Sequence, residues 1–470
     1  MLFSSLIFLF AFLPIVLVLY YTVFRKSIRL QNLLLLIASI FFYAWGEPKF
    51  VFVMMASIIM NYTWAILVDR YEYKKRTIFL AVATNLGLLF VFKYLNFTVS
   101  NIDHFFGNIF PQTDIALPIG ISFFTFQAMS YVIDVYRGDT KVQRNILYVA
   151  LYISFFPQLI AGPIVRYTDI ESKLETRKVS FDDFTVGTKK FLIGLSKKVI
   201  IANNLAIITD AAFDSIEGGG YLSLCFAWLG AITYALQIYF DFDGYSEMAI
   251  GLGKMFGFHF PENFIYPYRS KSIHEFWKYN HISLCTWFRD YVYIPLGGSR
   301  RGKLVWMRNM FIVWALTGIW HGASWTFLIW GLAYFVLLVI EKELKIPECF
   351  KRGGFLYRAF TLVCLFVLNG VFFRDIGAEN TTRYLISMFS LKGGLFDNLA
   401  MQYILEYKVI IVVAIIYAFA GFYLLRKSLS HSKLNSLVEI ISPIVYIALF
   451  FVSISYLAIG AYNPFIYFNF

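Results

Sequence analysis

The chain has 470 residues, of which 59% are hydrophobic and only 15% are charged. A soluble domain has about 25% charged residues and at most about half apolar residues. The composition therefore excludes a soluble enzyme, a disordered chain and a disulfide-bonded secreted domain, and it predicts an all-α polytopic membrane protein. The net charge of +12 indicates basic cytoplasmic loops beside anionic membrane lipids and no nucleic acid partner, because the basic residues lie in short loops between apolar runs.

Nine apolar runs have the composition of helices that cross, or nearly cross, a hydrocarbon core about 30 Å thick. The first run is followed by Arg25, Lys26 and Arg29, whereas a signal peptide has its charge before the apolar core. We therefore expect a transmembrane helix with an outer N-terminus, and the alternation of basic loops then places residues 461–470 outside the cytoplasm. Residues 210–220 carry acidic and no basic side chains and are expected in an outer loop. The predicted spans are 1–24, 30–46, 50–68, 77–95, 115–136, 221–240, 359–373, 409–425 and 440–460, and the topology of residues 140–220 stays open.

Three other stretches do not resemble simple spans. Pro157 interrupts residues 146–165, the glycines of residues 318–322 interrupt the apolar run 309–340, and residues 262–308 mix aromatic with charged side chains. Irregular backbone at membrane depth is tolerated where it is buried in protein or lines a wet cavity. We therefore expect a ring of transmembrane helices with re-entrant segments around a central funnel. The expected organisation is a single membrane domain with peripheral helices in 1–110, a catalytic core in 111–340, C-terminal helices in 341–460 and an extracytoplasmic aromatic tail in 461–470.

His321 is the only residue between Arg308 and Glu341 that can carry a charge near neutral pH. An ionisable side chain within the membrane is costly, which makes a functional role the default hypothesis. Burial favours the neutral imidazole, the form that a general base needs. The alternative is a structural histidine that binds a backbone carbonyl freed by the helix break.

His281 lies in a segment rich in aromatic and basic residues, 276–300. This segment is a candidate site, or alternatively an amphipathic helix that anchors the protein in the membrane interface.

Three acids, Asp241, Asp243 and Glu247, come at the end of a predicted span. A cation site is one interpretation, but too few oxygen ligands follow at loop spacing. The pattern favours a polar helix end with ion-pair partners such as Arg269 or Arg289. The four cysteines contain no CxxC pair, so the sequence predicts no metal site.

Several runs resemble the membrane-bound O-acyltransferase family and, within it, the bacterial alginate and peptidoglycan O-acetyltransferase branch. FWKYNHISLCTWFRDYVYIPLGGSR at 276–300 and GIWHGA at 318–323 resemble its two signatures. LPIGISFFTFQ at 117–127, AGPIVRY at 161–167 and QIYFDFDGYSEMAIG at 237–251 resemble the alginate branch, while Asn280 departs from its usual Trp.

The resemblance implies a helix ring around a thinned centre, with His281 and His321 near a through-channel. It also implies acyl transfer from a cytoplasmic thioester, with acetyl-CoA as co-substrate and no permanently bound cofactor. His321 is the expected base and His281 a second catalytic residue, and basic side chains at the cytoplasmic mouth suit the phosphates of CoA. The expected substrate-binding residues are Arg289, Asp290, Gln237, Asp241 and Trp320, and Arg300, Arg301 and Lys303 are further candidates for the phosphates.

The chain ends in the aromatic sequence 464–470, which contains Tyr467. This tail is either an interfacial anchor or the bearer of a transient acyl group. A phenol has a pKa of about 10 and loses its proton more easily than a sugar alcohol, so Tyr467 is a candidate carrier that divides one difficult transfer into two. The resemblance supports this role, because family relatives have similar ends.

These features together predict a multi-pass O-acetyltransferase of a bacterial inner or plasma membrane. It would move acetyl groups across the bilayer for an extracytoplasmic polysaccharide, an alginate-like exopolysaccharide or peptidoglycan. The resemblance implies an extracytoplasmic partner of the SGNH-hydrolase type, with a Ser-His-Asp site that completes the transfer. The alternatives are a transporter or channel without acyl chemistry, and acylation of a lipid, a teichoic acid or a peptide.

Overall fold

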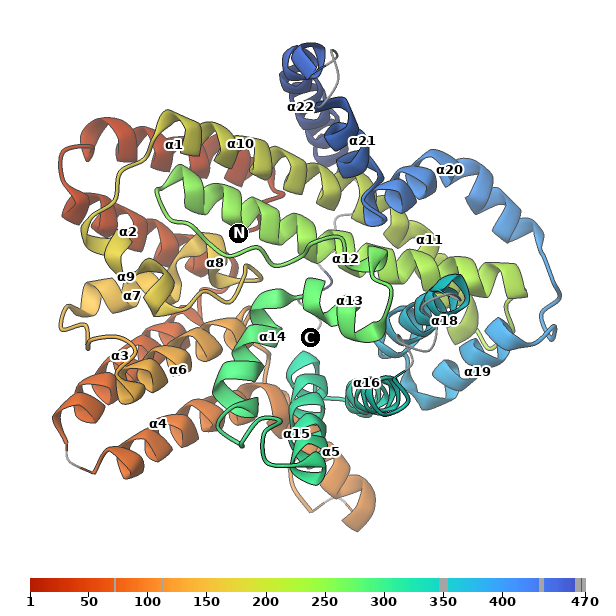
Figure 1. Cartoon of the computed structure of the whole chain (residues 1–470), viewed down its shortest axis with the longest axis horizontal. Coiled ribbons are helices and arrows are strands. Elements are labelled where there is room, and N and C mark those ends of the chain that lie inside the picture. Colours follow the sequence, from red (N-terminus) through yellow and green to blue (C-terminus); the bar gives the residue numbers. More distant parts are fainter. Residues whose placement is uncertain are drawn as a thin grey trace. The chain divides into compact units, whose positions relative to one another are not determined.

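The computed structural model describes residues 1–71, 73–107, 109–111, 113–345, 354–430, 435–460 and 466. Their regular structure is helical, without a β-strand among these residues (Figure 1), which confirms the predicted fold class. In the described part of the chain, nine helical segments are long and apolar enough to cross a membrane. They are Ile28–Gly46, Val51–Arg70, Lys74–Phe106, Phe181–Glu217, Leu224–Met255, Trp325–Glu343, Gly354–Phe372, Asn398–Ala418 and Asn435–Ala458.

Most of the predicted spans correspond to one of these segments, but four expectations need correction. The first helical stretch, Phe8–Val23, is shorter than a typical span. The run 115–136 gives only Ile121–Arg137, because Pro118 and Gly120 precede it. The segments Phe181–Glu217 and Trp325–Glu343 were not predicted as spans. The first of these two contains several charges, and it also takes up most of the predicted outer loop 210–220.

The chain divides into two compact units. Unit 1 comprises Met1–Phe191 and Tyr245–Glu262, and unit 2 comprises Leu192–Gly244 and Asn263–Phe470. Helices α10, Phe181–Ser196, and α12, Leu224–Met255, each contribute residues to both units.

In unit 1, helix α6 (Ile121–Arg137) is buried over most of its length and packs against α3, α4 and α7. Gly120 and Gly138 flank it at φ 76° and 80°, a conformation that glycine adopts without strain. The predicted interruption near Pro157 is confirmed, because α7 ends at Ser154 and Pro157 lies in the first turn of α8. The helices of unit 1 are η1 Phe8–Phe12, α1 Leu13–Val18, η2 Leu19–Val23, α2 Ile28–Gly46, α3 Val51–Arg70, α4 Lys74–Leu89, η3 Phe90–Tyr94, α5 Leu95–Phe106, α6, α7 Ile146–Ser154, α8 Phe156–Leu159 and α9 Tyr167–Glu175.

Unit 2 contains both histidine motifs and the end of the chain. Short helices α13 and α14 follow α12 in the segment expected to be re-entrant. Its helices are η4 Lys197–Ala202, α11 Asn203–Glu217, η5 Pro267–Arg269, α13 Ile273–Tyr279, α14 Ile282–Phe288, η6 Arg289–Tyr293, α15 Lys303–His321, α16 Trp325–Glu343, α18 Gly354–Val367, η7 Leu368–Phe372, α19 Gly377–Phe389, α20 Asn398–Ala418, α21 Gly421–Ser430 and α22 Asn435–Ala458.

The break expected at residues 318–322 lies later in the chain than predicted. Helix α15 continues to His321, and only Gly322 leaves the helical conformation, at φ −169°. Gly318 instead allows close packing, because a Cβ there would lie 2.5 Å from the Phe327 carbonyl oxygen of α16. The glycine that resembles a helix breaker in the sequence thus brings α15 and α16 together, and His321 becomes the last residue of α15.

Candidate active site

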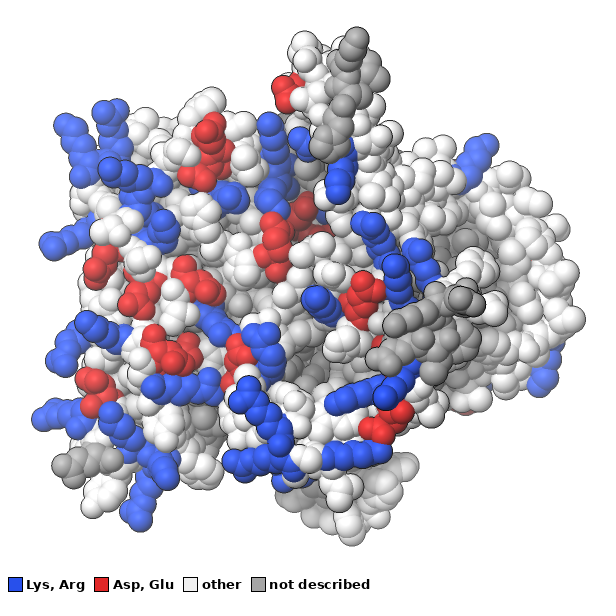
Figure 2. All heavy atoms as spheres, viewed as in Figure 1, with Lys and Arg blue, Asp and Glu red and all other residues white. Residues whose placement is uncertain are grey.

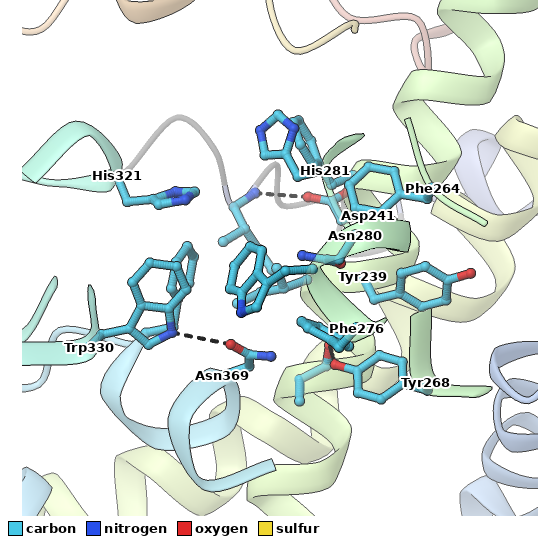
Figure 3. A pocket seen from close by; sticks show the side chains of 16 residues that line it. Tyr239, Asp241, Phe264, Tyr268, Phe276, Asn280, His281, His321, Trp330 and Asn369 are labelled. Atoms are coloured by element: carbon cyan, nitrogen blue, oxygen red, sulfur yellow. Dashed lines mark hydrogen bonds between the residues drawn. The ribbon is translucent and has the colours of Figure 1, made fainter. Parts of the chain in front are cut away.

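His321 and His281 line one cavity of about 60 Å³ in unit 2. Their side chains are 4% and 3% exposed, and the ring centroids lie 6.4 Å apart. Figure 3 shows the two imidazoles on either side of a common space, His321 at the end of α15 and His281 before α14. We call this space the histidine cavity. Its other lining residues are Ala235, Ile238, Tyr239, Asp241, Phe242, Phe264, Tyr268, Phe276, Trp277, Asn280, Trp330, Asn369, Phe373 and Ile466.

His281 has an unusual backbone and a defined hydrogen-bond partner. Its φ of 48° is positive, which is uncommon for a residue other than glycine and is often found at functional sites. The Ser283 backbone amide donates to Asn263 Oδ1 at 3.1 Å, which identifies that atom as the amide oxygen. The Nδ1 atom of His281 lies 3.3 Å from the same oxygen, so Nδ1 is the donor and carries the proton.

The remaining ring nitrogen of His281 is therefore a bare acceptor. Nε2 is buried without a hydrogen-bond partner among the described residues. His281 lies outside the nine candidate spans, and burial lowers its pKa to about 3, because a buried imidazolium would lose its hydration. A neutral imidazole with a free acceptor is the form that removes a proton from a hydroxyl.

Aromatic rings surround His321. The rings of Trp320, Trp330 and Phe373 each have their centroid 5.0 Å from that of the imidazole. Asn369, on the π-helical segment η7, accepts a hydrogen bond from Trp330 Nε1 at 3.1 Å (Figure 3). This bond orients the Trp330 ring, which forms part of the wall beside His321.

The acidic run of α12 does not lie at the end of a span, as its sequence suggested, but inside the helix. Asp241 pairs with Lys198 at 2.6 Å and Asp243 with Lys197 at 2.7 Å, and all four side chains are at most 5% exposed. Asp241 and Asp243 therefore pair with lysines and not with the expected Arg269 or Arg289. Buried carboxylates are tolerated within an apolar helix when a cation neutralises them.

The other predicted substrate-binding residues lie in different places. Gln237 is buried in α12 but is not among the residues that line the histidine cavity, and Trp320 contacts the cavity's histidines without lining it. Asn280, the position that departs from the family pattern, is a lining residue.

A second, larger cavity of about 510 Å³ lies in the same unit and contains Arg289. Its basic lining residues are His274, Lys278 and Arg289, so we call it the basic cavity. Arg289 pairs with its neighbour Asp290 at 2.6 Å. Trp277 lines both cavities. Figure 2 shows Lys and Arg side chains gathered over the region of α14, α15 and α16.

One described residue of the C-terminal stretch, Ile466, lines the histidine cavity. The backbone amide of Ile466 donates to Asp241 Oδ2 at 3.1 Å (Figure 3), and Ile466 lines the cavity. Tyr467 lies outside the described residues.

Sequence reasoning missed three residues of this site: Asn263, Asn369 and Lys198. Asn263 and Asn369 belong to no recognisable motif. Their roles depend on hydrogen bonds from His281 and Trp330, which the sequence does not reveal. The double lysine at 197–198 and the acids of 237–247 were visible in the sequence, but the pairing of the lysines with Asp241 and Asp243 depends on the packing of η4 against α12.

Comparison with known proteins identifies a family whose match includes both histidines. The family model of the membrane-bound O-acyltransferases matches residues 140–345. A probable alginate O-acetylase of Pseudomonas putida is 39% identical over 498 residues, across the whole of both chains.

Two further relatives are more distant. A peptidoglycan O-acetyltransferase of Helicobacter pylori is 34% identical over 84% of this chain and 80% of its own length. A teichoic acid D-alanyltransferase of Bacillus subtilis is 32% identical over 47% of this chain and 58% of its own length. Similarity across the entire sequence, together with the membrane-spanning helices, shows that this chain is a multi-pass acyltransferase of the membrane-bound O-acyltransferase family.

Proposed function

We propose that this enzyme is an O-acetyltransferase that moves acetyl groups from cytoplasmic acetyl-CoA across a bacterial inner or plasma membrane to an extracytoplasmic polysaccharide. The observation that carries the proposal is the meeting of His281, His321 and the tail residue Ile466 at one cavity. The family match, and relatives named as O-acetylases, favour acyl transfer over a transporter or channel.

The basic cavity is the proposed site of the donor. At about 510 Å³ it has the volume of a small-ligand pocket, and its apolar wall suits the extended arm that carries a thioester. Lys278 and Arg289 would attract the phosphates of CoA. Trp277, shared with the histidine cavity, would then stand where the thioester meets the chemistry.

The proposed chemistry needs a base and no metal-bound or tightly bound cofactor, because a thioester is already activated. His321 takes the proton of the attacking hydroxyl, the hydroxyl oxygen forms a bond to the acetyl carbonyl carbon, and the C–S bond breaks. The imidazolium returns the proton to the departing sulfur, and CoA leaves as the free thiol. The hydrogen bonding of His281 supports its role as a second proton acceptor beside His321.

The proposed attacking hydroxyl is that of Tyr467. Its aryl ester would be formed in the first step and consumed in the second, when an extracytoplasmic partner with a serine nucleophile takes the acetyl group and the phenol is regenerated. The position of Ile466 at the histidine cavity supports this relay, because Tyr467 is the next residue in the sequence.

The names of the relatives support a polymeric acceptor. The Pseudomonas putida relative is described as acting on alginate and the Helicobacter pylori relative on peptidoglycan. We propose an acceptor of this class, reached through an SGNH-hydrolase-like partner outside the cytoplasm.

The test of the proposal is to trap the acylated enzyme. In proteoliposomes given acetyl-CoA labelled in the acetyl group, wild type should release CoA thiol and retain label at Tyr467, located by mass spectrometry. Tyr467→Phe keeps the ring and removes the hydroxyl, so at least a tenfold loss of label is expected for a covalent carrier.

Two results would contradict this proposal. Label that persists in Tyr467→Phe would exclude the tyrosine as carrier. Passage of an intact solute without release of CoA thiol would favour a transporter instead.

A further inference from the structure

Asp241 and Asp243 form two buried ion pairs of the same kind, but they have different surroundings. Both acids lie on α12, and both lysine partners lie on the π-helical segment η4. Among the described residues, only Asp241 of the two lines the histidine cavity. The molecule therefore contains one ion pair at the cavity and a closely matched one away from it.

The two oxygens of Asp241 have different partners. Oδ1 lies 2.6 Å from Lys198 Nζ, and Oδ2 accepts the backbone amide of Ile466 at 3.1 Å. Lys198 Nζ in turn donates to Asn203 Oδ1 at 3.1 Å. The carboxylate is thus held on one side by a cation that is itself anchored, and it presents the other side to the tail.

The buried position of Asp241 strengthens its hydrogen bond to the Ile466 backbone amide. A hydrogen bond to an ionised acceptor is about twice as strong as one between neutral groups, and the low dielectric of a buried site strengthens it further. Ends of chains are normally poorly ordered unless they are tied down.

We propose that Asp241, held by Lys198, is a positioning residue that clamps the C-terminal tail of this chain at the histidine cavity. The clamp binds the backbone of residue 466 rather than a side chain, so it sets where the tail lies without contributing to the transfer chemistry. The purpose of the clamp rests on the proposed carrier role of Tyr467, whereas the docking of the tail is measurable without any acyl transfer.

The experiment compares the two matched ion pairs. The double variant Asp241→Leu/Lys198→Met removes the clamp, and Asp243→Leu/Lys197→Met removes the other pair. Replacing both members of a buried pair by apolar residues of similar size is often neutral or stabilising, so both proteins are expected to fold. A third variant, Asp241→Asn/Lys198→Met, restores a neutral amide oxygen that can still accept the Ile466 amide.

Docking is read by a photo-crosslinking residue, p-benzoylphenylalanine, introduced at position 466 of the full chain in nanodiscs without acetyl-CoA. Crosslinks to the segments that carry Phe242, Phe264 and His281 are expected in wild type and in Asp243→Leu/Lys197→Met. Their yield should fall at least fivefold in Asp241→Leu/Lys198→Met and recover in part with Asp241→Asn. Melting temperatures of the variants in detergent establish that each is folded.

Equal crosslinking in the two leucine double variants would overturn the clamp. So would an equal loss in both, because that result would make the two ion pairs merely structural. Labelling of the tail by acetyl-CoA supplies a second measurement, in which loss of the clamp should lower kcat while leaving KM for acetyl-CoA within about twofold. Should the crosslinks behave as expected while Tyr467→Phe still supports polymer acetylation, the clamp stands and the carrier role fails.

Discussion

The two cavities of unit 2 share Trp277 but differ in nearly every other respect. The histidine cavity is small, about 60 Å³, and its lining includes two histidines, one aspartate, two asparagines, two tyrosines and two tryptophans. The basic cavity is about eight times larger at about 510 Å³, and it carries the exposed side chain of Arg289 and the amine of Lys278. The difference matches the roles that we propose for the two cavities, namely binding of acetyl-CoA in the basic cavity and proton transfer in the histidine cavity.

We expect the largest effect from replacing His321, the proposed base. His321→Ala should lower kcat for acetyl transfer by about 100-fold or more, because general base catalysis is worth about 10²–10⁴-fold. Binding of acetyl-CoA should be unchanged, since His321 does not line the basic cavity. Release of CoA thiol in proteoliposomes measures the rate.

The control for this change is His259→Ala, which alters a half-exposed histidine of unit 1 that pairs with Asp183. Undiminished turnover in His321→Ala would remove this residue as the base.

We expect a smaller effect from replacing Asn263, whose side-chain amide orients His281. Asn263→Ala removes the acceptor of the His281 Nδ1–H bond, so both tautomers of the ring become accessible. Loss of one such hydrogen bond is worth about 1–1.5 kcal/mol, which corresponds to a fall in kcat of about tenfold.

The matched control for Asn263→Ala is Asn263→Asp, which keeps an oxygen acceptor for Nδ1. Partial recovery of kcat is expected with Asp, while a rate in Asn263→Ala equal to that of wild type would contradict the orienting role.

A substitution in the basic cavity should alter the affinity for acetyl-CoA rather than the rate of the chemical step. Lys278→Ala should raise KM for acetyl-CoA about fivefold and leave kcat nearly unchanged, because an exposed charge contributes about 1 kcal/mol to an ionic contact. The effect should shrink in 0.5 M salt, where exposed charges are screened. A fall in kcat at constant KM would assign Lys278 to the chemistry and erase the distinction between the cavities.

The last prediction concerns the pH dependence of stability. Burial lowers the pKa of His281 to about 3 from about 6.5 in an unfolded chain. Between these pH values the unfolded chain binds more protons than the folded chain, so stability falls as the pH drops below about 6.5 and is fully retained above it. His281→Gln should flatten that decline by up to about 1.4 kcal/mol per pH unit.

Melting curves of the detergent-solubilised protein at pH 5 to 8 measure this slope. The curves of wild type and His281→Gln should run parallel above pH 7, which serves as the internal reference. Identical slopes at pH 5 to 6 would show that His281 is hydrated and that the histidine cavity is open to water.

Features that depend on neighbouring residues were predicted correctly, whereas contacts between distant segments were not. The fold class followed from the apolar runs, and the two histidine motifs were recognised as local runs of sequence. The breaks were predicted near the right residues, but Gly318 was taken for a helix breaker although it is a packing contact between α15 and α16. A glycine has the same appearance in a sequence whether it ends a helix or admits a neighbour.

Asp241 and Asp243 of α12 also show that a local sequence pattern does not reveal tertiary contacts. Their sequence suggested a helix end, because an unpaired carboxylate is too costly inside a membrane. Lys198 and Lys197 neutralise them in the structure, and that compensation is invisible until two segments more than 40 residues apart are packed together.

The helical fold, the repeated membrane crossings and the two histidine motifs could be predicted from the sequence, because hydropathy and short motifs are properties of neighbouring residues. The structure was needed to show that the two histidines line one cavity, that Asn263 accepts a hydrogen bond from His281 Nδ1, and that Asp241 binds the backbone of Ile466. Those contacts join residues far apart along the chain, and their free energy depends on burial that no single segment creates alone.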